Sequence, residues 1–361
     1  MLKKLLVSLL VLLLLAGCGS NAGGSTEKVE GDFSGETLNV FLPGEYIDEE
    51  VVAAFEEEYD VKVNLTTFAS NEEMYTKLLG GTSYDILIPS DYMIEKLMSE
   101  NMIKKIDKTK IPHIGDLYDG MLCDYDPNFD YSVPYFWGSV GLVYDAEKID
   151  QKDVESQGWS VLKNPKYKDL IWLSNYNTAG TAKLVLNTMI QKLGHDEGIR
   201  YLVDLDKNIE VYTKSGSGPS KNVGTAECLI GIGFLHDGIT QILDNGYDNI
   251  ELIIPSSGTS CEIGATAIFK GNKHPNAAKL WIEYALSPEC VNLAQNNGSY
   301  QFLVIDNATQ PQVAIDFGLD PTNVMDYDFE DATNNIKTYV EEVGSMNMFF
   351  KINGVLVDVL H

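Results

Sequence analysis

The chain has 361 residues, with 26 Lys or Arg against 53 Asp or Glu and a net charge of −27. This length suffices for one large domain or two ordinary ones, and the acidic balance argues against nucleic acid as a partner. The sequence contains no CxxC, HExxH or GxSxG motif, so it carries no signal for a zinc cluster or a hydrolase.

The N-terminal segment, MLKKLLVSLLVLLLLAGCGS, has two lysines followed by about a dozen apolar residues, the size of a signal-peptide core. Its end, LAGC at positions 15–18, is similar to a bacterial lipobox, which implies cleavage before Cys18 and lipid attachment to its thiol. An ordinary signal peptide with a chance cysteine is the alternative. We predict a signal peptide over 1–17, a lipidated N-terminus and flexible tether over 18–37, and an extracytoplasmic protein anchored to the bacterial cell membrane.

After the tether, the apolar residues recur alternately at every second position, as in a strand, and at every third or fourth position, as in a helix. Strands are predicted over 38–42, 61–68 and 84–89, and helices over 47–59, 71–79 and 93–100. Because strands and helices alternate, the pattern predicts a mostly parallel sheet covered by helices.

The same alternation recurs further along the chain and predicts a second α/β unit. Its strands are expected near 170–173, 209–213 and 229–234, and its helices over 181–193 and 219–226. Further strands at 251–254 and 264–269 precede helices at 275–286 and 288–296. Two α/β lobes in one chain are expected to hold a ligand at the carboxyl ends of their strands and between the lobes.

Two parts of the chain resemble known solute-binding proteins. The stretches LNVFLPGEYIDEEVVAAFEEEYDVKV, SNEEMYTKLLGGTSYDILIPSDYMIEKL and GMLCDYDPNFDYSVPYFWGSVGLVYD resemble the spermidine/putrescine-binding proteins of bacterial ABC importers, over residues 37–150. Over residues 159–345, NPKYKDLIWLSNYNTAGTAKLVL, LDKNIEVYTKSGSGPSKNV, GIGFLHDG and GTSCEIGATAIFKGNKHPNAAKLWIEYALSPE are more similar to binding proteins for ferric ion or 2-aminoethylphosphonate.

Both resemblances imply the type II periplasmic binding protein fold, in which two α/β lobes joined by crossing strands close on one solute molecule. They imply a monomeric importer component with no cofactor and no catalytic activity, which delivers its solute to an ABC permease and its ATPase. The predicted limits are 38–142 for the first part of lobe 1, 143–260 for lobe 2, 261–345 for the return to lobe 1 and the C-terminal helices, and 346–361 for an atypical apolar tail.

The first lobe carries site candidates after its first and third strands. Polyamine-binding relatives have Trp-Thr-Glu-Tyr in the first of these loops, which here contains Glu45 and a matching Tyr46. Ser90, Asp91 and Tyr92 resemble the family's Ser-Thr-Tyr, whose Ser and Tyr line the cleft. Tyrosine faces attract an alkylammonium by about 0.5–2 kcal/mol. The two acids are expected either to pair with an ammonium or to complement a helix N-terminus.

In the second lobe, polyamine-binding relatives place an Asp and a Glu at a strand-to-helix junction. The counterparts here are Asn175 and the run 177–181, in which Thr178, Gly180 and Thr181 are the site candidates. Because this junction lacks carboxylates and offers free N–H groups, it favours an anion. A second such junction contains Ser215 and Ser217. Simple N-capping is the alternative explanation for both junctions.

Three further candidates come from the resemblance. Phe234 takes the place of a cleft tryptophan, and it is followed by His236 and Asp237, which form either part of the cleft or a turn. Glu262 lies where the polyamine relatives have Trp-Met-Asp and is still able to offer a carboxylate to an amine. Tyr300 corresponds to a tyrosine that lines the family's cleft.

Several solutes and one different class of protein remain open at this point. A polyamine such as spermidine or putrescine is favoured because the first-lobe resemblance is the more specific. The alternative is 2-aminoethylphosphonate or another phosphonate or anion. Ferric ion ranks third, because the ferric-binding relatives use adjacent tyrosines and this chain has no Tyr-Tyr pair. An extracellular enzyme or an adhesin is the different class, although no nucleophile and base are recognised.

Overall fold

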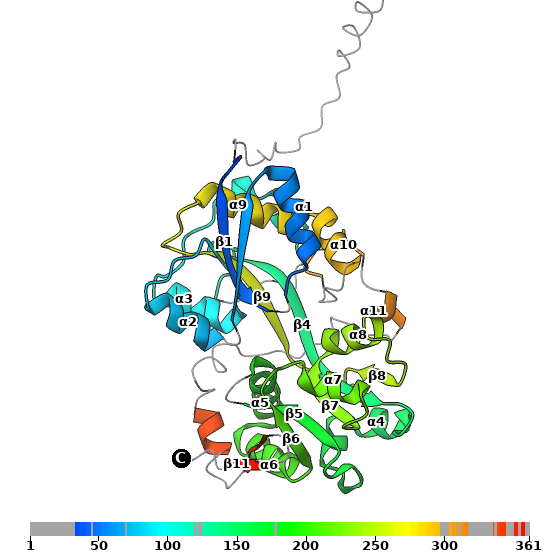
Figure 1. Ribbon diagram of the computed structural model, residues 1–361. Coiled ribbons are helices and arrows are strands. Elements are labelled where there is room, and N and C mark those ends of the chain that lie inside the picture. Colours follow the sequence, from blue (N-terminus) through cyan, green and yellow to red (C-terminus); the bar gives the residue numbers. More distant parts are fainter. Residues whose placement is uncertain are drawn as a thin grey trace, which may run out of the picture.

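A computed structural model gives the architecture of the chain, and it shows two α/β lobes stacked end to end (Figure 1). The described residues are 33–44, 46–68, 71–118, 121, 125–176, 179–296, 303–305, 307–309, 312–316, 335, 338–343, 350–352 and 355–357. The predicted signal peptide, Cys18 and most of the predicted tether lie outside these residues. Across the described residues, no helix combines the length and apolar character needed to cross a bilayer.

The first lobe begins with the predicted alternation of strands and helices. Its strands are β1 (Thr37–Pro43), β2 (Lys62–Phe68) and β3 (Ile86–Leu87), and its first helices are α1 (Glu49–Tyr59), α2 (Asn71–Leu79) and α3 (Asp91–Ser99). β1 lies between β2 and β3 and is parallel to both. The carboxyl ends of these strands therefore meet at one edge of the lobe, where ligands of parallel sheets bind.

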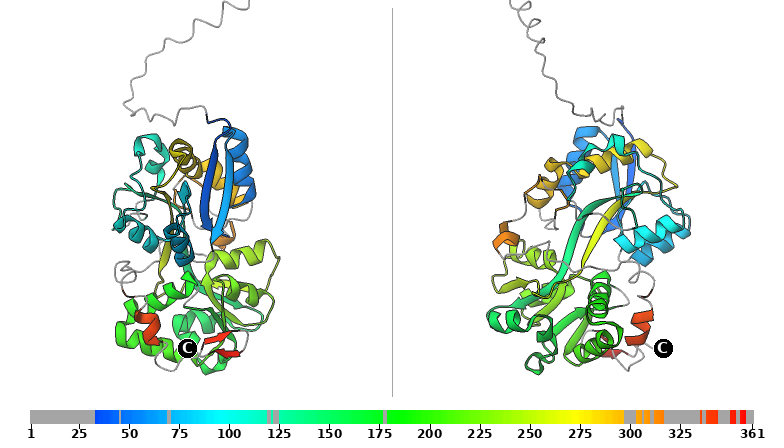
Figure 2. Two further views of the ribbon diagram at one scale, coloured as in Figure 1. Left: turned by 60° about the vertical axis from the view of Figure 1, so that its left-hand side comes forward. Right: turned by 180° about the vertical axis from the view of Figure 1, so that it is seen from behind.

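Two long strands run from one lobe into the other, as the resemblance implied. They are β4 (Ser132–Asp145) and β9 (Cys261–Ile268). β4 pairs antiparallel with β9 from Ser132 to Ser139, and its continuation pairs with strands of the second lobe. Figure 2 shows both strands crossing between the lobes. A rotation of one lobe against the other must be absorbed in these strands.

The second lobe is a second parallel unit. Its strands are β5 (Ile171–Ser174), β6 (Ile209–Thr213), β7 (Ile230–Phe234) and β8 (Ile250–Ile253), and its helices are α4 (Gln151–Gln157), α5 (Gly180–Leu193), α6 (His195–Asp206), α7 (Gly218–Gly224) and α8 (Leu235–Leu243). β5 is parallel to β6 and β7. In the described part of the chain, one curled sheet runs β2-β1-β3-β9-β4-β7-β5-β6, with β8 beside β4.

The chain then returns to the first lobe with α9 (Pro275–Ala285) and α10 (Pro288–Asn296), followed by α11 (Gln312–Asp316). Trp281 of α9 is fully buried. Its ring packs edge-on against that of Phe55 of α1, with the two ring centroids 4.9 Å apart. Burying side chains of this size contributes about 1.5–3 kcal/mol each. The core therefore joins the first and last parts of the lobe.

The remaining elements are short. Short 3-10 helices among the described residues cover Lys108–Lys110, Pro112–Asp116, Gly158–Lys163 and Pro165–Tyr167. In the apolar tail, β10 (Phe350–Ile352) and β11 (Val355–Val357) form an antiparallel pair, drawn in red beside α6 and β6 in Figure 1. The residue limits predicted for the lobes from the sequence stay predictions.

Candidate functional site

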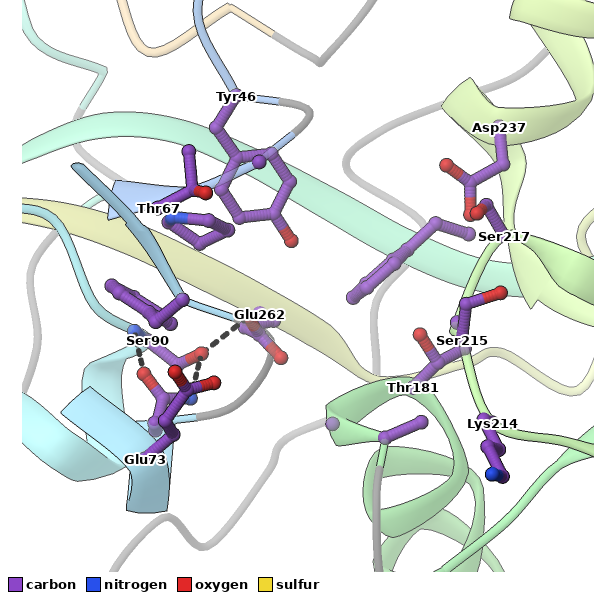
Figure 3. Close-up of a pocket in the computed structure, with 18 of the residues that line it drawn as sticks. Tyr46, Thr67, Glu73, Ser90, Thr181, Lys214, Ser215, Ser217, Asp237 and Glu262 are labelled. Carbon is purple, nitrogen blue, oxygen red and sulfur yellow. Dashed lines mark hydrogen bonds between the residues drawn. The ribbon is translucent and has the colours of Figure 1, made fainter. Parts of the chain in front are cut away.

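A cleft of about 850 Å³ lies between the two lobes. This volume is in the range of small-molecule sites. First-lobe residues and one residue of β9 form one wall: Pro43, Gly44, Tyr46, Thr67, Phe68, Asn71, Glu72, Glu73, Ser90, Tyr92 and Glu262. Second-lobe residues form the facing wall: Ala179, Gly180, Thr181, Lys214, Ser215, Gly216, Ser217, Phe234, His236 and Asp237. Figure 3 shows labelled members of the two walls facing each other.

A hydrogen-bond network holds Glu262 at the first-lobe wall. Ser90 Oγ donates to Glu262 Oε1 at 2.6 Å, and Asn71 Nδ2 donates to Ser90 Oγ at 2.8 Å. Asn71 Oδ1 in turn accepts from the Ser90 backbone N–H at 3.2 Å. These bonds are dashed in Figure 3. Glu262 therefore has one oxygen fixed by Ser90, which orients the carboxylate.

The pKa of Glu262 depends on its burial and on the groups around it. Burial raises the pKa of Glu262, and the hydrogen bond from Ser90 and the charge of Lys183 offset part of that increase. The nearby Asp91 also has a raised pKa, first because it is buried and second because of the charge on Glu262. A cation that entered beside Glu262 would stabilise its ionised form.

Asp91 does not line the cleft. One carboxylate oxygen accepts the Ile263 backbone N–H at 2.9 Å, and the other accepts the Tyr92 N–H at 2.7 Å in the first turn of α3. This is the helix N-terminus alternative considered for Asp91. The carboxylate thereby ties α3 to the crossing strand β9.

The N-terminus of α5 faces a carboxylate of the other lobe. A Cβ atom added to Gly180 would lie 3.4 Å from Glu262 Oε2, so the first turn of α5 and Glu262 are in close approach. The N-cap residue of α5 is Ala179, which offers no side-chain cap. The strand-to-helix junction without carboxylates is thus complemented by a carboxylate from across the cleft.

An ion pair joins the two walls beside this contact. Lys183 Nζ of α5 lies 2.8 Å from Glu72 Oε1 of α2, and Tyr92 OH donates to the same oxygen at 3.2 Å. Burial alone would raise the pKa of Glu72, but the charge and the hydrogen bond of Lys183 hold it below its ordinary value. Glu72 is therefore ionised at neutral pH and bound to the second lobe.

The rest of the second-lobe wall is polar. A Cβ atom at Gly216 would lie 2.6 Å from Thr181 Oγ1, so a side chain at this position would force the Thr181 hydroxyl to move. Ser217 is the N-cap residue of α7, and its side chain makes no capping hydrogen bond. The simple N-capping considered from the sequence is therefore found at neither α5 nor α7.

His236 and Phe234 form a stacked pair in this wall. Their ring centroids are 5.0 Å apart and their planes differ by 15°. Burial lowers the pKa of His236 to about 4, so the ring is neutral at pH 7. His236 Nε2 lies 3.7 Å from Asp237 Oδ1, and Figure 3 shows the Asp237 carboxylate beside Ser217. The second lobe therefore contributes a carboxylate to the cleft.

The structure places the predicted site residues in three groups. Those that line the cleft are Tyr46, Ser90, Tyr92, Gly180, Thr181, Ser215, Ser217, Phe234 and Glu262. Asp91 and Asn175 are described and buried but do not line it. Glu45, Thr178 and Tyr300 lie outside the described residues. The backbone of Asn175 accepts from Ala179 N and donates to Thr213 O, so Asn175 shapes the junction before α5.

Sequence reasoning missed one part of the first-lobe wall, which is the start of α2. Asn71, Glu72 and Glu73 line the cleft there, whereas the sequence predicts for them only the first turn of a helix. The available signal was their position after the carboxyl end of β2, the same argument that selected Ser90 after β3. Thr67 and Lys214 were also missed.

For a metal ion, the described residues offer no group of three or more His, Cys, Asp or Glu side chains placed to hold one.

Residues 82–320 match the family model of bacterial extracellular solute-binding proteins. Among curated proteins, the chain is 28% identical to the spermidine/putrescine-binding periplasmic protein of Salmonella typhimurium over 299 residues, covering 79% of this chain and 83% of that protein.

Two solved structures show the same fold. The periplasmic binding protein AfuA of Actinobacillus pleuropneumoniae, with fructose-6-phosphate bound, has a TM-score of 0.73 and 26% identity and covers 86% of this chain and 99% of its own. The ferric binding protein of Campylobacter jejuni has a TM-score of 0.73 at 20% identity, covering 85% of this chain and 98% of its own, which shows the fold alone. The predicted type II periplasmic binding protein fold is confirmed, and the chain belongs to the family of bacterial extracellular solute-binding proteins.

Proposed function

We propose that this protein captures an amine-containing solute, such as spermidine or putrescine, between its lobes and delivers it to the permease of an ABC importer. One observation carries the proposal. The charged side chains that line the cleft are mainly carboxylates, and they come from both lobes: Glu72, Glu73 and Glu262 from one wall and Asp237 from the other, against Lys214.

The chemistry of an ammonium group matches this cleft. An ammonium removed from water must be paired, because an isolated buried charge is very costly. Glu262 offers such a pair, since Ser90 occupies one oxygen and the carboxylate lines the cleft. Tyr46, Tyr92 and Phe234 add aromatic faces for the methylene chain and for cation–π contact.

Asp237 changes the balance between the two solutes considered from the sequence. The junction before α5 lacks carboxylates, which argued against a polyamine. Asp237, in the first turn of helix α8, supplies the acidic group of the second lobe instead. The names of the Salmonella relative and similar curated proteins support the same solute class.

Direct solute contact is proposed for the predicted residues that line the cleft, together with Glu72, Glu73 and Asp237. Asp91 and Asn175 are proposed to support the wall, because their contacts run to backbone groups beside it. Roles for Glu45, Thr178 and Tyr300 remain predictions from the resemblance.

A second candidate is a phosphorylated or phosphonate solute, such as a sugar phosphate or 2-aminoethylphosphonate. It is favoured by the polar wall of Thr181, Ser215 and Ser217 with Lys214, and by the fructose-6-phosphate named for the Actinobacillus relative. Against it, Glu262 approaches the first turn of α5 and Asp237 lies beside Ser217. Both carboxylates would repel an anion at the wall that would bind it.

Isothermal titration of the purified protein with spermidine, putrescine, 2-aminoethylphosphonate and fructose-6-phosphate separates these candidates. We expect saturable one-to-one binding of a polyamine and no heat of binding from fructose-6-phosphate. Tight binding of either phosphorus compound, with no response to either polyamine, would refute the proposal that the solute is a polyamine.

The predicted lipid anchor, the extracytoplasmic location, the monomeric state and the permease and ATPase partners belong to the same proposal. Replacing the predicted lipidation residue tests the anchor. The Cys18→Ser protein is expected in the soluble fraction of cells, whereas the unchanged chain is expected in the membrane fraction. Equal membrane association of both would contradict anchoring at Cys18.

A further inference from the structure

Helix α5 has an unusual first turn. It contains no acidic residue, and Lys183 lies one turn from its first residue, Gly180. A lysine at this end of a helix is unfavourable locally, because the N-terminus already carries a partial positive charge. In contrast, the first turn of α2 contains Glu72 and Glu73, as the helix dipole favours.

The unfavourable charge on α5 is compensated from the other lobe. Lys183 Nζ contacts Glu72 Oε1 at 2.8 Å, and Glu262 Oε2 approaches the backbone at Gly180. The Lys183 side chain is only 16% exposed, although Glu72 is 55% exposed. Two carboxylates of one lobe therefore meet the positive end of a helix and its lysine in the other.

We propose that Glu72 and Lys183, supported by Tyr92, form a latch that holds the two lobes closed. The latch is made only when the lobes approach, because its members are on α2 and α3 in one lobe and on α5 in the other. It therefore favours closure whatever solute is bound, and it acts before any solute arrives.

The latch also has a consequence for specificity, and this part rests on the proposed function. Lys183 neutralises Glu72 in the closed cleft, so Glu72 attracts a solute ammonium less strongly than an unpaired carboxylate would. Glu73 is itself paired with Lys77 on α2 at 2.7 Å. Removal of the Lys183 charge is thus expected to raise the affinity ratio of spermidine over the shorter, less charged putrescine.

Small-angle X-ray scattering of the solute-free protein tests the latch. Lys183→Met and Glu72→Gln each remove one charge and keep a similar side-chain length. We expect both to lower the closed-to-open ratio by about two- to fivefold, the range of partly exposed ion pairs, and so to raise the radius of gyration. High salt is expected to produce the same opening in the unchanged protein, because one partner is exposed.

Two controls keep this experiment decisive. Lys166→Met breaks the ion pair with Asp153 at 2.6 Å inside the second lobe and should leave the radius of gyration unchanged. The charge-swapped E72K/K183E protein should restore part of the closure. Thermal unfolding identifies any variant that is not folded. If Lys183→Met does not fold, the radius of gyration of Glu72→Gln alone tests the latch.

The latch is overturned if the solute-free scattering of Lys183→Met and Glu72→Gln equals that of the unchanged protein. It is also overturned if the charge swap restores nothing. Because these measurements contain no solute, they are independent of the titrations that test the amine proposal. Each proposal can therefore fail without the other.

Discussion

At the scale of single residues, the cleft is built around the buried carboxylate of Glu262. The residue was selected from the sequence as a replacement for an acidic site, and the structure places it against Ser90 and Gly180. Asp91 is a candidate because it stands in the stretch that resembles the family's Ser-Thr-Tyr, but its oxygens accept backbone N–H groups. The sequence does not separate these two acids, because Asp91 follows β3, Glu262 lies within β9, and only the direction of the side chain shows which carboxylate enters the cleft.

Replacing Glu262 by Gln is predicted to weaken polyamine binding strongly. The Gln oxygen still accepts the hydrogen bond from Ser90, so the variant removes mainly the charge. Loss of one partner of a buried ion pair costs about 2 kcal/mol or more, or about thirtyfold in Kd by titration calorimetry. Glu57→Gln on the exposed face of α1 is the matched control and should bind normally. Unchanged affinity in Glu262→Gln would rule out this carboxylate as the ammonium partner.

Replacing Asp237 by Asn discriminates between the two solute classes. If the solute is a polyamine, affinity should fall by about tenfold or more, because a cleft carboxylate is lost. If the solute carries a phosphate, affinity should rise, because the repulsion beside Ser217 is removed. Titration of the variant with spermidine and with fructose-6-phosphate measures both effects. An increase for the phosphate alone would reverse the proposed assignment.

At the scale of elements, much of the fold was predictable from apolar periodicity. The helix predicted at 181–193 is α5 over Gly180–Leu193, and the strand predicted at 209–213 is β6 over Ile209–Thr213. The strand predicted at 84–89 is regular only over Ile86–Leu87, although the N–H groups of Asp85 and Ile88 still donate to Asn39 and Phe41 of β1. Periodicity reports burial, whereas strand limits depend on the partner strands β1 and β9.

Helix α5 closely approaches the loop before α7, and this approach depends on Gly216. A side chain at this position would meet Thr181 Oγ1 at 2.6 Å. Gly216→Ala is predicted to destabilise the protein by about 1–3 kcal/mol, measured by urea unfolding, because the β-branched Thr181 has little room to rotate.

The control for this prediction is Gly115→Ala. Gly115 has open space around its Cβ position and should tolerate the methyl group. The double variant G216A/T181A should recover part of the loss, since it removes the hydroxyl that the methyl group meets. No difference between Gly216→Ala and Gly115→Ala would contradict the packing argument.

At the scale of the whole molecule, the two lobes meet through charges as well as through the crossing strands. This contact was not predictable from the sequence, because Glu72 and Lys183 are 111 positions apart. Each is an ordinary surface-type residue in its own helix. Only the topology that places α2 opposite α5 turns them into partners.

The buried acids predict a pH dependence of the whole molecule. Because the pKa of Glu262 is raised on folding, the folded protein binds more protons than the unfolded chain between its ordinary pKa and the raised one. Its contribution to stability is therefore present at low pH and is lost as pH rises through the raised pKa.

Glu262→Gln removes this loss and also the charge that helps to raise the pKa of Asp91, so the melting temperature of the variant minus that of the unchanged protein should increase as the pH rises above 4.5, the ordinary pKa of a glutamate. The difference between the two proteins is the useful quantity, since His236, with its lowered pKa, changes stability in the opposite direction in both. A difference that stays constant with pH would contradict the assignment of the raised pKa.

Calorimetric titration of spermidine into the unchanged protein and into Glu262→Gln tests whether the cleft binds a polyamine through the Glu262 carboxylate. We expect saturable one-to-one binding by the unchanged protein and a loss of affinity of about thirtyfold or more in the variant. Equal spermidine affinity in the two proteins, or saturation by fructose-6-phosphate with no response to spermidine, would contradict it.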